Sequence, residues 1–368
     1  MKLLILSDAN STHTLKWIQS LCQKESYDIF LFSFFKPNST SINIYKKYNI
    51  KFSSPNLESK IRNIRRPNLS KIIYLKSLFD LKKIIKKFKP DIVHAHYASS
   101  YGVLGLLTGF KPFILSVWGS DIYHFPYLNP LNKIIMKKII HKSDKICSSS
   151  IAMKKIITKE YGREEIEVVP FGIDTDRFKP NKQKKNQFVV GTIKSIENHN
   201  GIECLLDAAK IVIHDLKKDI NFVIVGEGSL RKQMESRAIE LKIEKMVKFL
   251  GYVNHEKVYK HFQNLSLFVA VSKRESFGVS ILEAAACEVP SITSNIGGLP
   301  EVNIDKLTGI VIKPDNPIDL AGSIIKLYEN KDLRTKMGKS ARERVIKKFN
   351  WKDNVNEMIK IYNSSITL

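Results

Sequence analysis

The sequence predicts an α/β protein with two doubly wound, Rossmann-like domains. Short apolar segments alternate with longer amphipathic ones, which is the pattern of β-α-β units with a mostly parallel sheet. The alternation stops at a polar stretch with two prolines, residues 168–187, which is typical of an interdomain linker, and then starts again. The strands of the second half are mostly apolar, as expected where helices cover both faces of a sheet. A chain of 368 residues is long enough for two such domains.

The first half contains four predicted strands and two predicted helices. The strands span 2–8, 27–34, 91–96 and 113–119, and the helices span 14–23 and 78–88. In the first helix, Leu15, Ile18 and Leu21 recur at helical spacing and form one apolar face. The second helix is basic and amphipathic, and it ends before Pro90.

The second half repeats this alternation. The predicted strands span 187–193, 221–228, 247–253, 265–272, 290–295 and 309–313, and the predicted helices include 204–213 and a final one at 350–362. Two α/β domains joined by one linker leave a cleft, and open α/β sheets bind ligands at the carboxyl ends of their strands. Functional residues are therefore expected in the loops that lead from a strand to a helix.

The charge balance of the chain is strongly basic. There are 60 Lys and Arg against 36 Asp and Glu, which gives a formal charge of +24. Such a charge attracts nucleic acids, anionic lipid surfaces and phosphorylated substrates. The alternative is compositional, because Lys, Ile and Asn are used heavily throughout the chain.

The cysteines and the apolar segments bear on the location of the protein. The four cysteines are scattered and show no metal-ligand spacing, which is typical of buried thiols in a reducing compartment. The apolar segment 2–7 is interrupted at once by polar residues, so it is predicted as a strand and not as a secretory signal. We expect a cytoplasmic protein, with at most a peripheral contact to the inner face of the cell membrane.

The strongest motif is KRESFGVSILEAAACEVPSIT, residues 273–293. After a strand, a turn contains Ser276 and Gly278, and a helix follows. The N-terminus of a helix offers free N–H groups and a partial positive charge, which suit a diphosphate or sugar hydroxyls. Glu275 before the helix and Glu283 within it can each accept hydrogen bonds from a polyhydroxylated ligand. The alternative is a solubilising loop glutamate and a helix glutamate with a local partner.

Glu275, Phe277, Gly278 and Glu283 reproduce the E-x(7)-E element of retaining glycosyltransferases of family 4, which have the GT-B fold. Further motifs of that family occur in the family's order along almost the whole chain, and their joint order is more specific than any one of them. They are DIVHAHYA (91–98), SVWGSDIY (116–123), PFGIDTDRF (170–178), VGTIK (190–194), HNGIE (199–203), VGEGSLR (225–231) and IGGLPEVNIDKLTGIVIKPDN (296–316). The chain resembles this family, and in particular its bacterial surface-polysaccharide type.

The resemblance implies a domain plan. It has two Rossmann-like domains that face each other across a cleft. An N-terminal acceptor-binding domain is expected at 1–170 and a nucleotide-sugar-binding domain at 171–345. A C-terminal helix in 346–368 is expected to pack back towards the first domain.

By resemblance, the second domain holds the donor. Glu283 is expected to bind the ribose hydroxyls, and Glu275 the donor sugar. Lys194 follows a strand where the family has a basic diphosphate contact, and a cation there offsets charge on the leaving diphosphate; the alternative is one of many surface lysines. The donor-binding candidates are Lys194, Gly226, Gly228, Gly251, Tyr252, Val253, Phe277, Gly278, Val279 and Glu283.

Two donor-site features are open to another interpretation. The glycines of VGEGSLR suit a nucleotide pocket, but close strand-to-helix packing also requires glycine. The family often has a second cation just before the glycine of HNG, where this chain has His199 and Asn200. His199 can replace that cation only when it is protonated.

The first domain is expected to bind the acceptor, through His13, Trp118 and Gly119. His13 lies in the loop after the first strand, where a helix N-cap with an incidental histidine is the alternative. Many relatives carry a histidine at the position of Trp118, where it contacts the donor sugar. Because that histidine is missing, the catalytic candidates are Glu275, Asp121 and His96.

His94 and His96 end a predicted strand. Alternation places both side chains on one face of the sheet. We expect one of them in the core and His96 at the rim of the cleft.

Two further patterns suggest other functions. Asp174-Thr175-Asp176 mimics the metal-binding D-x-D of the other large glycosyltransferase fold, but it lies in the linker motif. We therefore expect no metal and no cofactor, with the nucleoside-diphosphate sugar as co-substrate. The lysine-rich helices contain Lys82, Lys83, Lys86, Lys87, Lys89, Lys133, Lys137 and Lys138. They lack interleaved aromatic residues, so nucleic acid is not expected. A solvated face is one interpretation, and a surface on anionic lipid near a lipid-linked acceptor is the one we prefer.

The predicted function is that of a retaining hexosyltransferase in cell-surface polysaccharide biosynthesis. It moves a sugar from a nucleoside-diphosphate sugar, with UDP favoured by its frequency among relatives, to a glycan or lipid-linked acceptor. No enzymic nucleophile is evident, so electrostatic preorganisation is expected to assist departure of the diphosphate. The alternatives are a nucleotide-sugar epimerase of the same fold and a nonenzymatic polyanion-binding protein.

Overall fold

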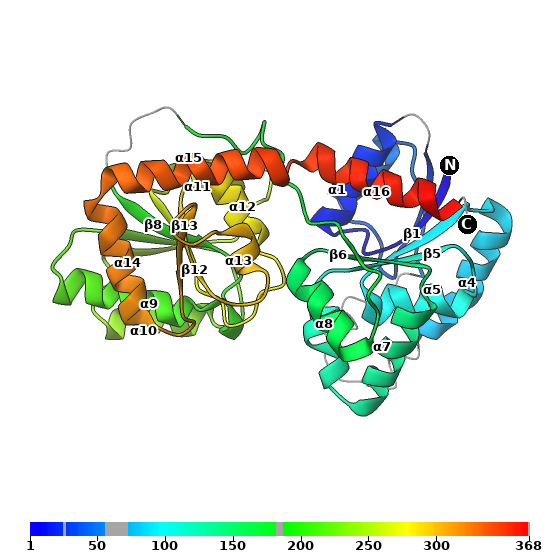
Figure 1. Ribbon diagram of the computed structural model, residues 1–368, viewed down its shortest axis with the longest axis horizontal. Coiled ribbons are helices and arrows are strands. Elements are labelled where there is room, and N and C mark those ends of the chain that lie inside the picture. The colour runs from blue at the N-terminus through cyan, green and yellow to red at the C-terminus, as the bar shows by residue number, and fades with distance from the viewer. Residues whose placement is uncertain (25–26, 56–72, 182–186, 367–368) are drawn as a thin grey trace. The chain divides into compact units, whose positions relative to one another are not determined.

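The computed structural model describes residues 1–24, 27–55, 73–181 and 187–366, with the backbone alone at 73–76. They form two compact units (Figure 1). Unit 1 comprises Met1–Pro170 and Lys352–Leu368, and unit 2 comprises Phe171–Trp351. Residues 182–186 of the predicted linker lie outside the described residues.

Unit 1 contains a parallel sheet with seven strands in the described part of the chain, in the order β3-β2-β1-β4-β5-β6-β7. The strands are β1 Lys2–Leu6, β2 Asp28–Phe32, β3 Lys51–Ser53, β4 Ile92–His96, β5 Phe113–Val117, β6 Lys145–Ser148 and β7 Glu167–Val168. The four predicted strands of this half are confirmed. Strands β3, β6 and β7 have no predicted counterpart because they are only two to four residues long.

Helices cover both faces of this sheet. They are α1 Thr12–Cys22, α2 Ser39–Lys47, α4 Ile73–Phe88, α5 Val103–Thr108, α6 Ser120–Tyr123, α7 Pro130–Lys142, α8 Ile151–Tyr161 and α16 Trp351–Ile366. Figure 1 shows α1 and α16 on one face and α5, α7 and α8 on the other. Strand residues such as Leu4, Val93 and Leu115 join the core with buried side chains of α5, α7 and α8. Their alternate neighbours, His94 among them, therefore face α16.

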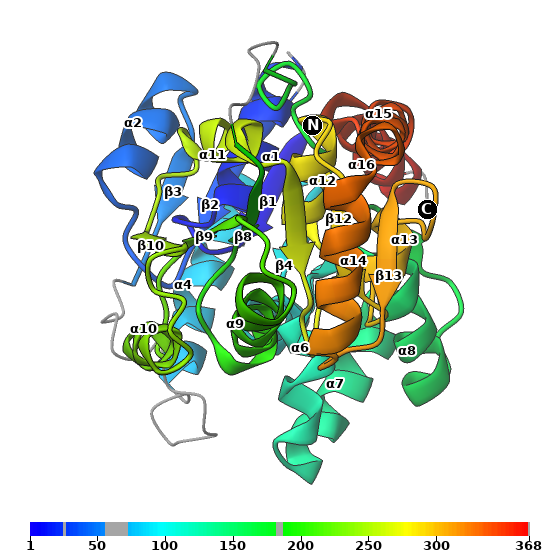
Figure 2. The ribbon, with the colours of Figure 1, turned by 90° about the vertical axis from the view of Figure 1, so that its left-hand side faces the viewer.

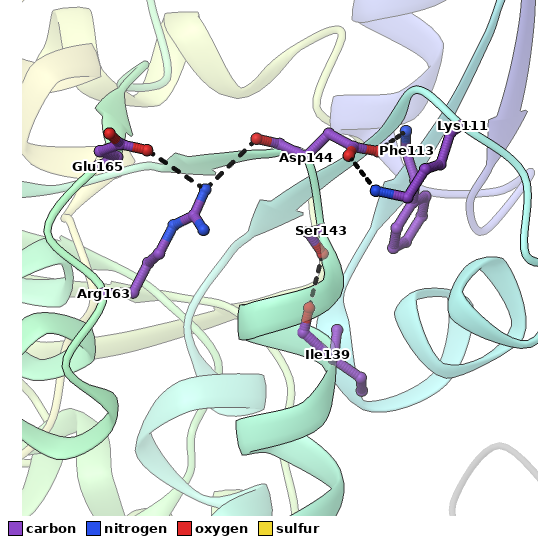
Figure 3. A network of polar contacts seen from close by, with 7 residues as sticks. All are labelled: Lys111, Phe113, Ile139, Ser143, Asp144, Arg163 and Glu165. Atoms are coloured by element: carbon purple, nitrogen blue, oxygen red, sulfur yellow. Dashed lines mark hydrogen bonds and ion pairs between the residues drawn. The ribbon is translucent and has the colours of Figure 1, made fainter.

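Asp144 fixes the edge of this sheet at the amino ends of β5 and β6 (Figure 3). Its side chain accepts hydrogen bonds from the Phe113 N–H at 2.8 Å and from Lys111 Nζ at 2.6 Å. Its carbonyl accepts from Arg163, which also pairs with Glu165 at 3.7 Å. These polar contacts satisfy the Phe113 N–H and the Asp144 carbonyl at the amino ends of the strands. The loops considered for a site lie at the opposite, carboxyl ends.

Unit 2 contains a second parallel sheet, with six strands among its described residues, in the order β10-β9-β8-β11-β12-β13 (Figure 2). The strands are β8 Val189–Ile193, β9 Asn221–Val225, β10 Val247–Gly251, β11 Leu267–Ala270, β12 Ser291–Ser294 and β13 Gly309–Ile312. Each matches a predicted strand, and the α/β class with two parallel sheets is confirmed.

The helices of unit 2 also form two layers. They are α9 Ile202–Lys210, α10 Arg231–Glu240, α11 Val258–Asn264, α12 Val279–Ala286, α13 Leu299–Val302, α14 Pro317–Glu329 and α15 Lys331–Lys348. Figure 1 shows α11, α12 and α15 on one face of the sheet and α9, α10 and α14 on the other. Among the helices that the structure describes, none combines the length and the hydropathy needed to cross a bilayer.

Both sheets have the same strand order relative to the chain, in which the first strand lies beside the fourth. The chain reverses direction across the sheet between β1 and β4 in unit 1 and between β8 and β11 in unit 2. Ligands of doubly wound sheets bind at such switch points, at the carboxyl ends of the strands. A ligand site is therefore expected in the loops after β8 and β11 in unit 2, and in the loops after β1 and β4 in unit 1.

Candidate functional site

The loops that follow β8 and β11 contact each other at the switch point of unit 2. The Lys273 N–H donates to the His199 carbonyl at 2.8 Å. Gly201 lies in the left-handed region at φ +71°, and a Cβ there would be 2.1 Å from the Val271 carbonyl oxygen. Only glycine therefore permits this close approach, which places Lys194, after β8, beside Glu275, after β11.

Lys194 and Glu275 form an ion pair. Their side chains are only 9% and 20% exposed, so the pair is largely removed from water. Lys194 Nζ also donates to Ser272 Oγ at 2.8 Å. An ammonium group has three N–H donors. Among the described residues, Ser272 and Glu275 are the partners of this ammonium, so two of the three donors are used.

The first turn of α12 lies next to this pair. Gly278 precedes the helix at φ +101°, and no side chain caps the first turn. The Gly298 N–H donates to the Glu275 carbonyl at 3.4 Å, which joins this turn to the start of α13. The N–H groups around Val279 and the ammonium of Lys194 therefore provide positive charge at one place, which suits a diphosphate.

Glu283 lies one turn further along α12 and is buried, with 6% of its surface exposed. Its Oε1 is 2.9 Å from Nε2 of His255, in the loop after β10. A buried carboxylate needs such a partner, because an unpaired charge is costly to bury. Glu275 and Glu283 therefore differ in their surroundings, one paired with a lysine and the other with a histidine.

The glycines of VGEGSLR serve close packing in this structure. A Cβ at Gly226 would be 1.9 Å from the Lys194 carbonyl oxygen, and one at Gly228 would be 2.2 Å from that of Ile196. Glu197 completes the contact, because it accepts hydrogen bonds from the N–H and the hydroxyl of Ser229. The loop thus supports the segment that carries Lys194, and a direct contact of these glycines with a nucleotide remains a prediction.

The predicted base-contact segment follows β10. Gly251 has φ +74°, and a Cβ there would be 2.8 Å from Nη1 of Arg231. Tyr252 is 75% exposed. Gly251 is buried and Val253 is half-buried, so Tyr252 is the exposed residue of this segment, and the contact of the segment with a base stays a prediction.

The surroundings of His199 disfavour a second cation at this position. Burial lowers its pKa, and the nearby positive charges of Arg274 and Lys194 lower it further, while Glu275 and Glu197 oppose the shift. The neutral imidazole is therefore favoured. Arg274 is exposed and acts on His199 as a nearby charge, a role that no sequence motif predicted.

Asp121 is fully buried in unit 1, which corrects the expectation that it touches a reacting group. Its carboxylate accepts hydrogen bonds from the N–H groups of Ala98 at 2.9 Å, Gly119 at 2.7 Å and Trp118 at 3.2 Å. Burial raises the pKa of this carboxyl, and these hydrogen bonds oppose the shift. Gly119 has φ +145°, a conformation that only glycine adopts readily. Asp121 therefore shapes the turn that presents Trp118.

Trp118 is part of an aromatic and polar cluster at the switch point of unit 1. Its ring centroid lies 4.7 Å from that of His96 and 5.7 Å from that of His13. His94 and His96 are both only 2% exposed, so the expected division into a core histidine and a rim histidine is wrong. Strand alternation predicted the face on which they lie, but it carries no information about what covers them, which is Tyr362 of α16 at His94 and the ring of Trp118 at His96.

The two buried histidines are satisfied by hydroxyl groups. His94 bonds Tyr362 of α16 at 2.8 Å and Ser116 at 2.8 Å, and His96 bonds Ser7 at 3.1 Å. Burial lowers the pKa of His94 to about 3 and that of His96 well below its ordinary value. Both are therefore neutral in the folded state.

These histidines predict that unit 1 loses stability in mild acid. The unfolded chain binds protons on both rings near their ordinary pKa of 6.5, while the folded unit does not. The free energy of unfolding should fall, once the pH is below 6, by about 1.4 kcal/mol per pH unit for each histidine. Urea unfolding between pH 7 and 4.5 measures this slope. His94→Gln should reduce the slope by about one proton, and an unchanged slope would contradict the assignment.

The sequence profile of the family "Glycosyl transferases group 1" matches residues 173–344, and that of "Glycosyl transferase 4-like" matches residues 2–150. The chain belongs to this glycosyltransferase family. The resemblance seen in the motifs is thereby confirmed, and the protein is an enzyme of a retaining hexosyltransferase family that uses nucleotide sugars.

Individual relatives of this glycosyltransferase support the assignment to the family. An uncharacterised glycosyltransferase of Methanocaldococcus jannaschii is 29% identical over 304 residues, which is 80% of this chain and 83% of that protein. The UDP-Gal:α-D-GlcNAc-diphosphoundecaprenol α-1,3-galactosyltransferase of Escherichia coli is 26% identical, over 80% of this chain and 81% of that one. The structure of Anabaena Alr3699/HepE has a TM-score of 0.82 at 18% identity, with coverage of 99% and 100%. This likeness confirms the GT-B fold.

The D-T-D segment of the glycosyltransferase forms a turn. Oδ1 of Asp174 accepts from the N–H groups of Asp176 and Arg177, each at 3.1 Å. Within the described ranges, no group of three or more His, Cys, Asp and Glu side chains is arranged to hold a metal ion.

Proposed function

We propose that this glycosyltransferase moves a hexosyl unit from a UDP-sugar to a lipid-linked or glycan acceptor, with retention, in the synthesis of a cell-surface polysaccharide. The observation that carries the proposal is the group formed by Lys194, Glu275 and Glu283 at the switch point of unit 2. The names of relatives support the finer points. The E. coli relative uses UDP-Gal and a diphosphoundecaprenol acceptor, and the HepE structures hold UDP or UDP-glucose.

In this proposal the donor lies along the start of α12. The third N–H of Lys194 and the free N–H groups near Val279 bind the diphosphate. Glu283 accepts hydrogen bonds from the ribose, and Glu275 from the donor sugar. As the bond to the diphosphate breaks, negative charge grows where these donors already lie, which lowers the barrier without reorganisation.

Unit 1 is proposed to bind the acceptor, near Trp118, Gly119 and His13. Asp121 holds the Trp118–Gly119 turn, so we propose it as a positioning residue. His96 lies behind the ring of Trp118 and supports it from the core. Both residues act through Trp118 in this proposal, since neither side chain is exposed.

A thermal-shift screen against UDP-, GDP-, ADP- and dTDP-sugars tests the function. A UDP-sugar should raise the melting temperature, because a ligand that binds only the folded state stabilises it by mass action. Incubation with that donor alone should leave the sugar unchanged. Epimerised sugar would favour the epimerase, and salt-dependent DNA binding without any donor shift would favour a polyanion-binding protein.

The tip of unit 1 at α7 suits an anionic membrane surface. Tyr127, Leu131 and Ile134 are 58%, 63% and 54% exposed, although they are apolar or aromatic. Lys137 and Lys138 are exposed on the same helix. Apolar side chains beside lysines are typical of peripheral membrane contacts. We propose that α7 brings the enzyme to the bilayer that carries its acceptor.

Vesicle binding tests this surface. Lys137→Glu with Lys138→Glu should reduce binding to phosphatidylglycerol vesicles at least tenfold, since each basic residue contributes about 1 kcal/mol near an anionic surface. Cosedimentation measures it, and phosphatidylcholine vesicles should bind weakly. Lys347→Glu with Lys348→Glu, at two exposed lysines of α15 in unit 2, makes the same charge change as a control. An equal loss in both variants would contradict a specific role of α7.

A further inference from the structure

We propose that His255 is a positioning residue for nucleotide binding: it fixes one oxygen of Glu283 so that the other is presented to the ribose, and Arg177 holds His255 in place. The inference rests on the proposed ribose role of Glu283. It concerns His255, in the loop after β10, and Arg177 of the PFGIDTDRF motif.

The first step is the bond between His255 and Glu283. Nε2 of His255 lies 2.9 Å from Oε1 of Glu283, whose side chain is 7% exposed. An ionised carboxylate only accepts hydrogen bonds, so Nε2 must carry the hydrogen and donate it. The hydrogen bonds among the described residues include none to Oε2 of Glu283. One oxygen is thus held by the protein and the other is left for a ligand.

The second step is the effect of a fixed carboxylate on ribose binding. A carboxylate that is free to rotate must lose that freedom when it binds a diol, whereas a fixed one has already lost it. His255 is 33% exposed and Glu283 lies beneath it, so the pair lies where buried protein meets solvent. Without the imidazole, the carboxylate would be buried with no partner and would turn towards other donors.

The third step is the support of His255 itself. Nη2 of Arg177 donates to the His255 carbonyl at 2.8 Å. The guanidinium lies 5.9 Å from the ring centroids of Phe178 and Tyr259, and the Phe178 ring lies 6.0 Å from that of His255. Asp174 fixes the turn that carries Arg177. The segment at the start of unit 2 therefore supports the loop after β10, and His255 in that loop positions the carboxylate of Glu283.

Calorimetry with two ligands tests the inference. UDP and 2′,3′-dideoxy-UDP are titrated into the full-length wild type, His255→Phe, His255→Gln, Glu283→Ala and the double variant His255→Phe/Glu283→Ala. His255→Phe should bind UDP about tenfold more weakly, because a hydrogen bond to a buried charge is lost. It should also lose most of the wild-type preference for UDP over the dideoxy ligand. Glutamine can place its N–H near the position of Nε2. His255→Gln should therefore keep most of the wild-type UDP affinity and most of the preference for UDP over the dideoxy ligand.

The double variant separates a positioning role from general damage. In the Glu283→Ala background, His255→Phe should have no further effect on UDP affinity, because the carboxylate that it positions is gone. Arg177→Met should weaken UDP binding in the same sense, with the dideoxy ligand less affected.

Two results would overturn the inference, in distinguishable ways. If Glu283→Ala weakens UDP binding while His255→Phe leaves it unchanged, or weakens it equally in both backgrounds, the positioning role is wrong and the ribose role stands. If Glu283→Ala itself binds UDP as the wild type does, the ribose role fails and the positioning role fails with it.

Discussion

Replacing Lys194 with methionine is expected to lower kcat/KM by about a thousandfold. Removal of one preorganised donor to a developing negative charge costs about 10²–10³ in rate. Here the same change also releases Glu275 from its only ion pair among the described residues, so the sugar contact is disturbed as well. Methionine keeps the length of the side chain and fills the same largely buried space, so the loss should be in charge and not in packing.

Steady-state kinetics of sugar transfer measures this effect, with Lys218→Met as the matched control. Lys218 is a lysine of the same unit that pairs with Glu329 at 2.7 Å and lies outside the proposed site. The control should stay within about twofold of the wild type, since surface ion pairs contribute little. A Lys194→Met enzyme that keeps a third or more of the wild-type kcat/KM would show that this ammonium does not assist departure of the diphosphate.

Gly226→Ala is expected to destabilise unit 2 by more than about 3 kcal/mol, because overpacking and backbone strain add at one position. The new Cβ would be 1.9 Å from the Lys194 carbonyl oxygen, and Gly226 has φ +146°. The neighbours cannot easily move apart, since the Lys194 N–H bonds Val225 at 3.0 Å and the Gly226 N–H bonds Gly251 at 2.8 Å. Any relaxation would shift Lys194 and weaken donor binding.

Urea unfolding of both variants measures this effect, with Gly322→Ala as the control. Gly322 lies within α14, and a Cβ there would meet no atom within 4 Å. Alanine is the better helix former, so the control should be neutral or more stable by up to about 1 kcal/mol. If Gly226→Ala unfolds at the same urea concentration as the wild type, the close packing of the glycine loop on the β8 loop is wrong.

The parts of this protein that could be predicted from sequence are those encoded locally. The strands predicted at 221–228 and 265–272 are recognisable by their apolar centres, residues 222–225 and 267–271, which are expected where helices cover both faces of a sheet. The switch-point location of Lys194 and Glu275 follows from the strand order of a doubly wound sheet. The E-x(7)-E spacing fixes Glu283 one turn into a helix, and the structure places it there.

The parts that could not be predicted depend on contacts between distant segments. Asp121 and His96 were expected to face a ligand, yet backbone N–H groups surround one and the ring of Trp118 covers the other. The pairing of His255 with Glu283 joins residues 28 positions apart, one in the loop after β10 and the other in α12, and no periodicity encodes it. The role of the glycines in VGEGSLR could not be predicted either, because their spacing fits a phosphate-binding loop and close packing equally well.

The most direct test of the account is the affinity of UDP for the wild type and for Glu283→Ala, measured by calorimetry. If Glu283 receives the ribose at the switch point of unit 2, its removal should weaken UDP binding about tenfold or more, the loss expected for hydrogen bonds to a charged group. Circular dichroism should show both proteins folded. An unchanged affinity in a folded Glu283→Ala protein would contradict the donor site proposed here.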